Sequence, residues 1–142
     1  MATMAAGTGT VLIGNAIDAI PSKSKPRMFD PFQIVTLGKT GIKTTLLGMG
    51  TGYSGYNRSS NITRAGVAES IIRAAYERGI RYFDCADSYG THPFTKAALK
   101  DIPRENYVLG TKMWVTAGGI PEKERPDSEI VVDRFRKELN TD

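Results

Sequence analysis

Short apolar runs alternate with stretches of helical period along most of this chain. The runs 33–37 and 42–45 flank the turn Gly38-Lys-Thr-Gly41 and predict a small β-hairpin, because glycine accommodates the positive φ of tight turns. The next run, 46–50, predicts a first buried strand. A polar loop rich in glycine, serine and asparagine follows it.

A helix is predicted over 63–78, because its apolar residues recur at the spacing of one helical face. The residues of this face are Val67, Ile71, Ala74 and Ala75. Asn61 or Thr63 can cap the start of the helix, and Gly79 can end it.

The alternation continues to the end of the sequence. A strand begins at Ile80, a short helix covers 93–100 and another strand covers 107–112. A last helix begins after Asp127 or Ser128. Its apolar residues, at helical spacing, are Ile130, Val131, Phe135 and Leu139. Strands that alternate with helices predict an α/β fold with parallel strands and right-handed crossovers.

The strand that begins at Ile80 carries the most reactive side chains. Its sequence, Ile-Arg-Tyr-Phe-Asp-Cys-Ala-Asp-Ser-Tyr, starts apolar and ends in two carboxylates, a hydroxyl and the phenol of Tyr89. The strand 107–112 ends in Lys112. Because the carboxyl ends of parallel strands meet at one edge of a sheet, we expect an acid, a phenol and an amine to lie together there.

Composition narrows the class of protein. A chain of 142 residues with 40% hydrophobic and 24% charged residues fits one modest soluble domain. The net charge of +4 is mild and no Lys/Arg block is long, so we expect no nucleic-acid partner. The single cysteine, Cys85, precludes an internal disulfide, and we expect it to pack in the core.

Residues 1–20 differ from the rest, because they contain no lysine or arginine and many alanines, glycines and threonines. They fit either an export signal without its basic start or a disordered tail, so cytoplasmic and exported locations both stay open. They are too weakly apolar for a transmembrane helix, and no membrane partner is expected. Residues 21–31 are typical of a linker. We therefore predict a leader and linker over 1–31 and a domain over 32–142.

Four motifs occur in order along the predicted domain. They are Leu37-Gly-Lys-Thr-Gly-Ile-Lys43, Gly48-Met-Gly-Thr51, Phe83-Asp-Cys-Ala-Asp-Ser-Tyr-Gly90 and Gly110-Thr-Lys-Met-Trp114. Together they resemble the aldo/keto reductases. The resemblance implies the N-terminal part of a (β/α)8 TIM barrel, with about three β/α units after a hairpin that closes its bottom. It also implies that aldehydes or ketones are reduced with NADP(H) rather than NAD(H).

The resemblance assigns catalytic roles. Asp84, Tyr89 and Lys112 match the acid, the proton donor and the lysine of the family's catalytic tetrad. The fourth member, a histidine at the end of the fourth strand, would lie beyond residue 142. His92, the only histidine, is expected at a loop or a helix start without that role. We therefore expect no turnover from the 142-residue chain alone; its oligomeric state is not predicted.

The resemblance assigns binding roles as well. Gly50 and Thr51, together with Asp84, would bind the cofactor, and Trp114 would form a wall of the pocket for a small carbonyl substrate. Hydride addition to a carbonyl builds negative charge on oxygen, so a proton donor is needed, and such help is worth ~10²–10⁴ in rate. A phenol titrates near pH 10, and a neighbouring ammonium favours its release of the proton.

Other interpretations stay open. Asp84 and Lys112 would form an ordinary ion pair if Tyr89 were only a packed aromatic. A metal site at Asp84 and Asp87 lacks a histidine or a second acid cluster, so no metal is predicted. Gly50-Thr-Gly-Tyr-Ser-Gly55 matches the G-x-G-x-x-G of a Rossmann unit, a motif that needs a helix to begin at the glycines. A non-catalytic fragment that folds only in an assembly is the remaining alternative.

Overall fold

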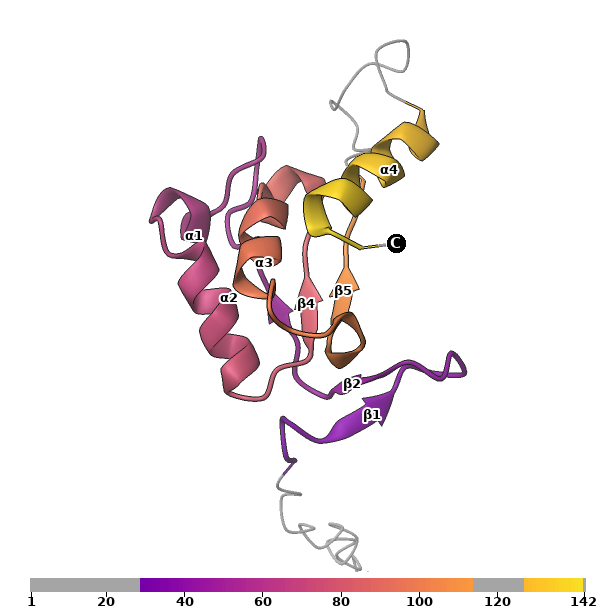
Figure 1. Cartoon of the computed structure of the whole chain (residues 1–142). Coiled ribbons are helices and arrows are strands. Elements are labelled where there is room, and N and C mark those ends of the chain that lie inside the picture. Colours follow the sequence, from indigo (N-terminus) through magenta and orange to yellow (C-terminus); the bar gives the residue numbers. More distant parts are fainter. Residues whose placement is uncertain (1–28, 114–126, 142) are drawn as a thin grey trace, which may run out of the picture.

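A computed structural model of the chain describes residues 29–113 and 127–141 (Figure 1). The predicted leader over 1–20 lies outside the described residues, as do residues 114–126. The strands are β1 (Ile34–Thr36), β2 (Lys43–Thr45), β3 (Met49–Gly50), β4 (Tyr82–Asp84) and β5 (Val108–Gly110). The helices are α1 (Asn61–Arg64), α2 (Ala68–Glu77), α3 (His92–Ala98) and α4 (Ser128–Leu139), with short 3-10 turns η1 (Asp87–Tyr89) and η2 (Arg104–Asn106).

The predicted hairpin is confirmed. β1 and β2 pair antiparallel, with Val35 opposite Thr44. The turn between them places Gly38 at φ 53° and Gly41 at φ 77°, the left-handed conformation for which glycine was expected there. A hydrogen bond connects the hairpin to the start of β4: the Arg81 backbone N–H donates to Thr45 Oγ1 at 2.9 Å.

The predicted parallel strands form a three-stranded sheet in the order β3-β4-β5. Phe83 in the central strand pairs with Met49 on one side and with Leu109 on the other. The first strand is shorter than predicted: β3 contains two residues, and Leu46 and Leu47 before it are about half exposed.

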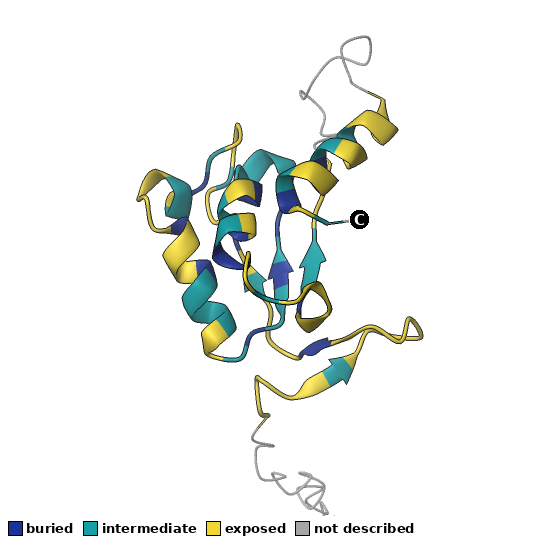
Figure 2. Ribbon diagram, in the orientation of Figure 1, coloured by how far each residue is buried: buried dark blue, intermediate teal, exposed yellow. Residues whose placement is uncertain are grey.

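The two faces of the sheet differ. Toward the helices, Phe83 and Cys85 are fully buried, which confirms Cys85 as a core residue (Figure 2). The buried core cluster comprises Ile72, Ile80, Phe83, Ala98, Leu99 and Tyr107. On the other face, Tyr82 and Asp84 are only partly buried. The site described below therefore lies at the carboxyl end of an open sheet face.

The helix predicted over 63–78 is two helices. Gly66, at φ 68°, ends α1, and α2 begins two residues later. Ser60 caps α1 in place of Asn61 or Thr63, with its backbone N–H donating to Thr63 Oγ1 at 2.8 Å.

The predicted buried face of this segment is confirmed at Ala75, but its other predicted residues lie one position before those that pack inward. The residues of α2 that pack inward are Ala68, Ile72, Ala75 and Tyr76. Val67 and Ile71 are 36% and 40% exposed. The end of the second helix was predicted correctly, because Gly79 follows its C-cap at φ 108°.

The last two helices agree with the prediction in place and capping. α3 begins at His92 with a proline in its first turn, and α4 is capped by Asp127, whose side chain accepts from the Glu129 N–H at 3.1 Å. Phe135 of α4 is buried, whereas Ile130 is 63% exposed. No helix in 29–113 or 127–141 has the length and apolar character needed to span a membrane.

Candidate active site

Asp84 and Lys112 meet at the carboxyl ends of β4 and β5. The Lys112 amine donates to Asp84 Oδ1 at 2.6 Å and to the Cys85 carbonyl oxygen at 3.0 Å. The contact follows from the parallel register, which sets Asp84 opposite Gly110, two residues before the lysine. Both side chains are partly exposed, so this pair faces solvent rather than the core.

The charge of Lys112 is favoured by its neighbours. Burial alone would lower the pKa of Lys112, but the hydrogen bond and the negative charge of Asp84 raise it above the ordinary value of 10.5. The Tyr89 phenol contributes in the same direction. The amine is therefore a stable cation over the physiological pH range.

Tyr89 completes the predicted group. It ends the η1 turn that follows β4, and the Lys112 amine lies 5.1 Å from the centroid of its ring. The ring packs against Gly52 and Gly55, where an added Cβ would overlap it. The acid, the phenol and the amine therefore lie close to one another, as the sequence predicted.

The same glycines decide against the Rossmann interpretation of the loop. That motif needs a helix that starts at the glycines, but α1 begins only at Asn61. Gly52 and Gly55 instead leave room for the ring of Tyr89. A packing requirement explains these glycines without a bound pyrophosphate.

Gly50 and Thr51 lie beside Asp84 in different surroundings. Gly50 is opposite Asp84 in the sheet, and an added Cβ there would meet no atom within 4 Å. Thr51 is buried, and both its N–H and its hydroxyl donate to the Asp84 carbonyl oxygen, at 3.0 and 2.9 Å. Its hydroxyl also lies 2.8 Å from Thr91 Oγ1. Cofactor contacts of these residues stay a prediction, and Trp114 lies outside the described residues.

A second group of charged side chains, which we call the charge cluster, lies beside Tyr89, and no motif of the sequence predicted it. It consists of Arg58, Asp87, His92, Arg134 and Glu138. Its members come from the loop before α1, from η1, from α3 and from α4, and Arg58 and Glu138 are 80 positions apart. No local spacing could have predicted their contact.

His92 is a buried member of the charge cluster at the first position of α3, which confirms the predicted helix start. Its Nδ1 lies 2.7 Å from Glu138 Oε2, and its Nε2 lies 2.8 Å from Thr111 Oγ1. The ring also packs edge-on against Phe135, with centroids 4.9 Å apart. Both ring nitrogens are therefore engaged in structural hydrogen bonds.

Glu138 is the acceptor at the centre of the charge cluster. Burial would raise the pKa of its carboxyl, but hydrogen bonds with His92, Arg58 and Arg134 outweigh that effect and lower the pKa from 4.5 to about 2. The Glu138 carboxyl is therefore ionised in the folded protein at neutral pH.

The metal interpretation of Asp84 and Asp87 finds no support in their contacts. Asp84 binds Lys112, whereas Asp87 binds Arg58 and Arg134. Within the described ranges, no group of three or more His, Cys, Asp or Glu side chains could hold a metal ion. The two carboxylates therefore have cationic partners of their own.

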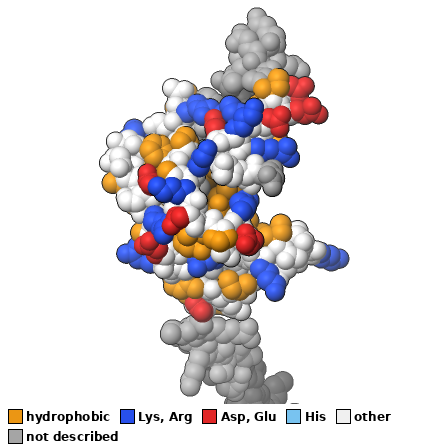
Figure 3. Space-filling view, in the orientation of Figure 1, with side chains coloured by type: hydrophobic (Ala, Val, Ile, Leu, Met, Phe, Trp, Pro, Cys, Tyr) orange, Lys and Arg blue, Asp and Glu red, His pale blue; other side chains and the backbone are white. Residues whose placement is uncertain are grey.

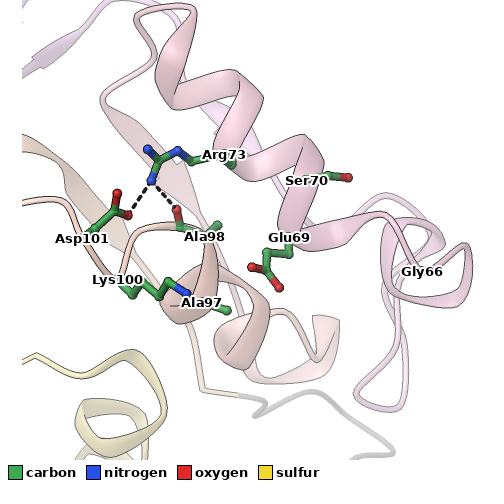
Figure 4. A pocket seen from close by; sticks show the side chains of 8 residues that line it. All are labelled: Gly66, Glu69, Ser70, Arg73, Ala97, Ala98, Lys100 and Asp101. Carbon is green, nitrogen blue, oxygen red and sulfur yellow. Dashed lines mark hydrogen bonds and ion pairs between the residues drawn. The ribbon is translucent and has the colours of Figure 1, made fainter.

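A second surface feature, a hollow between α2 and α3, contains none of the residues of the candidate site (Figure 4). Its Arg73 donates to Asp101 at 2.5 Å and to the Ala98 carbonyl oxygen at 3.3 Å. Asp101 follows the end of α3, whereas Tyr89 precedes its start, so the hollow and the site lie at opposite ends of this helix. Basic and acidic side chains are mixed over the face seen in Figure 3.

The chain resembles known proteins over this region. The model for the aldo/keto reductase family matches residues 46–142. Probable aldo-keto reductase 1 of Glycine max is 34% identical over 94 residues, which are 63% of this chain and 27% of that protein. Pyridoxal 4-dehydrogenase of Microbacterium luteolum is 43% identical over 80 residues, 54% of this chain and 22% of that protein.

Two further proteins are similar to this chain. Methionine aminopeptidase 2-1 of Leptosphaeria maculans is 34% identical over 93 residues, 63% of this chain but 18% of that protein. A crystal structure of a thermostable aldo-keto reductase in complex with the inhibitor epalrestat has a TM-score of 0.60 and 27% identity, over 78% of this chain and 39% of the other. The chain thus spans only 18–27% of the length of the curated relatives it matches.

Proposed function

This chain belongs to the aldo/keto reductase family, and on that premise we propose that it carries the acid, phenol and amine of an NAD(P)H-dependent carbonyl reductase. The reaction reduces an aldehyde or ketone to an alcohol, with a small carbonyl compound as substrate and no nucleic-acid, membrane or metal partner. One observation carries the proposal: Asp84, Lys112 and Tyr89 meet at the open ends of neighbouring strands.

Tyr89 is the proposed proton donor. Its phenolic proton passes to the carbonyl oxygen while the carbonyl carbon accepts a hydride, so the product is an alcohol and the tyrosine is left as phenolate. Lys112 lies beside the ring and stabilises that negative charge, and Asp84 holds the amine in place at 2.6 Å. A proton from water restores the phenol.

The hydride would come from a reduced nicotinamide cofactor, and NADP(H) is the form that the family resemblance implies. The described residues fit such a cofactor at Gly50, because the space in front of this strand end is open and next to Asp84. We propose that the absence of a side chain at Gly50 keeps this space clear. Thr51 holds the same strand end through its hydrogen bonds to Asp84 and Thr91.

We also propose that the three parallel strands are part of a (β/α)8 barrel. β3 and β5 are the edges of the described sheet, and apolar side chains such as Met113 and Val132 are about 40% exposed. Edge strands and apolar surface of this kind are normally covered. Additional β/α units would cover them and supply the fourth catalytic residue. We therefore expect the 142-residue chain to consume no NADPH by itself.

The test is a chimera in which the matched segment of the Glycine max relative is replaced by the corresponding residues of this chain. NADPH consumption is followed with a panel of simple aldehydes, and reduction of NADP+ is followed with pyridoxal, since one relative is named pyridoxal 4-dehydrogenase. Replacing NADPH with NADH at equal concentration tests the cofactor.

We expect the chimera to consume NADPH and the isolated chain to consume none. Robust turnover by the isolated chain, lost in Tyr89→Phe, would support the site but contradict the need for further β/α units. A folded chimera that binds NADPH and reduces no aldehyde would contradict the proposed function.

A further inference from the structure

Asp87 links the two sides of the proposed site through its backbone. Its N–H donates to the Lys112 carbonyl oxygen at 3.0 Å, and its own carbonyl oxygen accepts from the Gly90 N–H at 3.3 Å. The second bond closes the η1 turn that carries Tyr89. The position of the phenol relative to the amine therefore depends on where Asp87 is held.

The Asp87 carboxylate is held from two directions. Arg134 of α4 makes a two-point contact with its oxygens, at 3.0 and 2.8 Å, and Arg58 donates to it at 2.9 Å. The Asp87 side chain is only 16% exposed. A planar two-point contact fixes orientation as well as distance, which a lysine could not reproduce.

The same cluster also reaches the lysine side of the site. Glu138 accepts hydrogen bonds from both arginines, each at 2.9 Å, and contacts His92. His92 in turn contacts the hydroxyl of Thr111, the residue immediately before Lys112. The contacts of α4 therefore extend toward both functional side chains.

We propose that Arg134 is a positioning residue, which holds Asp87 together with Arg58 and so keeps Tyr89 beside Lys112. This inference rests on the proposed function, in which the phenol and the amine act together. Displacement of a reacting group by about 1 Å costs ~10²-fold in rate, so a distant arginine can matter without touching substrate.

Arg73 provides a matched control (Figure 4). Arg134 and Arg73 are 35% and 34% exposed, and each pairs with a glutamate four residues on and with one aspartate from another element. Of these two arginines, Arg134 alone forms an ion pair with a residue of the η1 turn. The variants Arg134→Gln and Arg73→Gln therefore remove similar ion pairs with different expected consequences at the site.

The experiment uses the 142-residue chain with isotopically labelled tyrosine and lysine, and Tyr89→Phe assigns the ring signals. Nuclear Overhauser contacts between the Tyr89 ring and the Lys112 side chain report the placement of the phenol. Thermal unfolding of each variant reports stability separately. Neither measurement needs activity, so failure of this inference is distinguishable from failure of the proposed function.

We expect Arg134→Gln to lose the contacts between Tyr89 and Lys112, and Arg73→Gln to keep them at a similar loss of thermal stability. If Arg134→Gln does not fold, Arg58→Gln is expected to weaken the same contacts, because it removes the other hydrogen bond to Asp87. Unchanged contacts in a folded Arg134→Gln protein, or in Arg58→Gln in its place, would overturn the inference. Equal losses in Arg73→Gln would do so too.

Discussion

The Lys112 amine lies 2.6 Å from the Asp84 carboxylate, although the two side chains are 49% and 41% exposed. An ion pair with this much access to water contributes little to folding, because solvent screens the charges. The pair is therefore better explained by its position beside Tyr89 than by the stability of the sheet.

Lys112→Met tests that explanation. We expect the free energy of unfolding to change by about 1 kcal/mol or less, since exposed ion pairs contribute that little. Urea unfolding of the isolated chain measures it, with Asp84→Asn as the companion variant. A loss of several kcal/mol in either variant would show that the pair is structural.

Two adjacent isoleucines test the orientation of α2. Ile72 is fully buried and Ile71 is 40% exposed. Ile72→Ala should destabilise the chain by about 2–5 kcal/mol, the usual cost of truncating a buried isoleucine, and Ile71→Ala by much less. Chemical denaturation of both variants decides. Equal losses would contradict the observed orientation of α2.

Gly66 and Gly90 test the close approach of the loop before α1 to the Tyr89 turn. Their φ angles are 68° and 64°, but an added Cβ meets no atom within 4 Å at Gly66, whereas at Gly90 it overlaps the Arg58 backbone. Gly66→Ala should cost about 1–2 kcal/mol for the left-handed conformation alone. Gly90→Ala should cost a further ~1–3 kcal/mol for the steric overlap. Similar unfolding free energies for both variants would contradict this contact.

The lowered pKa of Glu138 predicts that the protein loses stability as the pH falls into the acid range. Its pKa is lowered from 4.5 to about 2 on folding, so its contribution to stability is present above pH 4.5 and is lost as the pH falls toward 2. Unfolding free energies of the wild type and of Glu138→Gln should therefore converge across this range. Parallel curves for the two proteins would count against the hydrogen bonds assigned to Glu138.

Local features of the sequence predicted much of this fold. The positive φ of Gly38, Gly41 and Gly79 and the capping of α4 by Asp127 follow from side chains within a few residues. These features depend on backbone sterics and short hydrogen bonds, which sequence shows directly.

The inward face of α2 could not be predicted in the same way. The sets that start at Val67 and at Ala68 have the same helical spacing, so periodicity alone does not choose between them. Gly66, at φ 68°, separates α1 from α2, so the predicted single helix is not continuous through this position. Nothing in the local pattern distinguishes such a glycine from a tolerated one inside a helix.

The candidate site also contains residues that the sequence predicts and residues that it does not. Asp84, Tyr89 and Lys112 could be predicted because they follow strand ends and match a family motif. The charge cluster could not, since its side chains meet only after α4 packs against α3.

The proposed role of Tyr89 as the proton donor in carbonyl reduction can be measured through the NADPH consumption of the chimera. Tyr89→Phe is compared with Tyr76→Phe. The second variant removes the hydroxyl group of a tyrosine in α2, which packs against the core on the face of the sheet that the helices cover. We expect kcat to fall by ~10²–10⁴ for Tyr89→Phe, the usual contribution of a general acid, and to stay near normal for Tyr76→Phe. A folded Tyr89→Phe chimera that keeps its kcat would show that Tyr89 is not the proton donor.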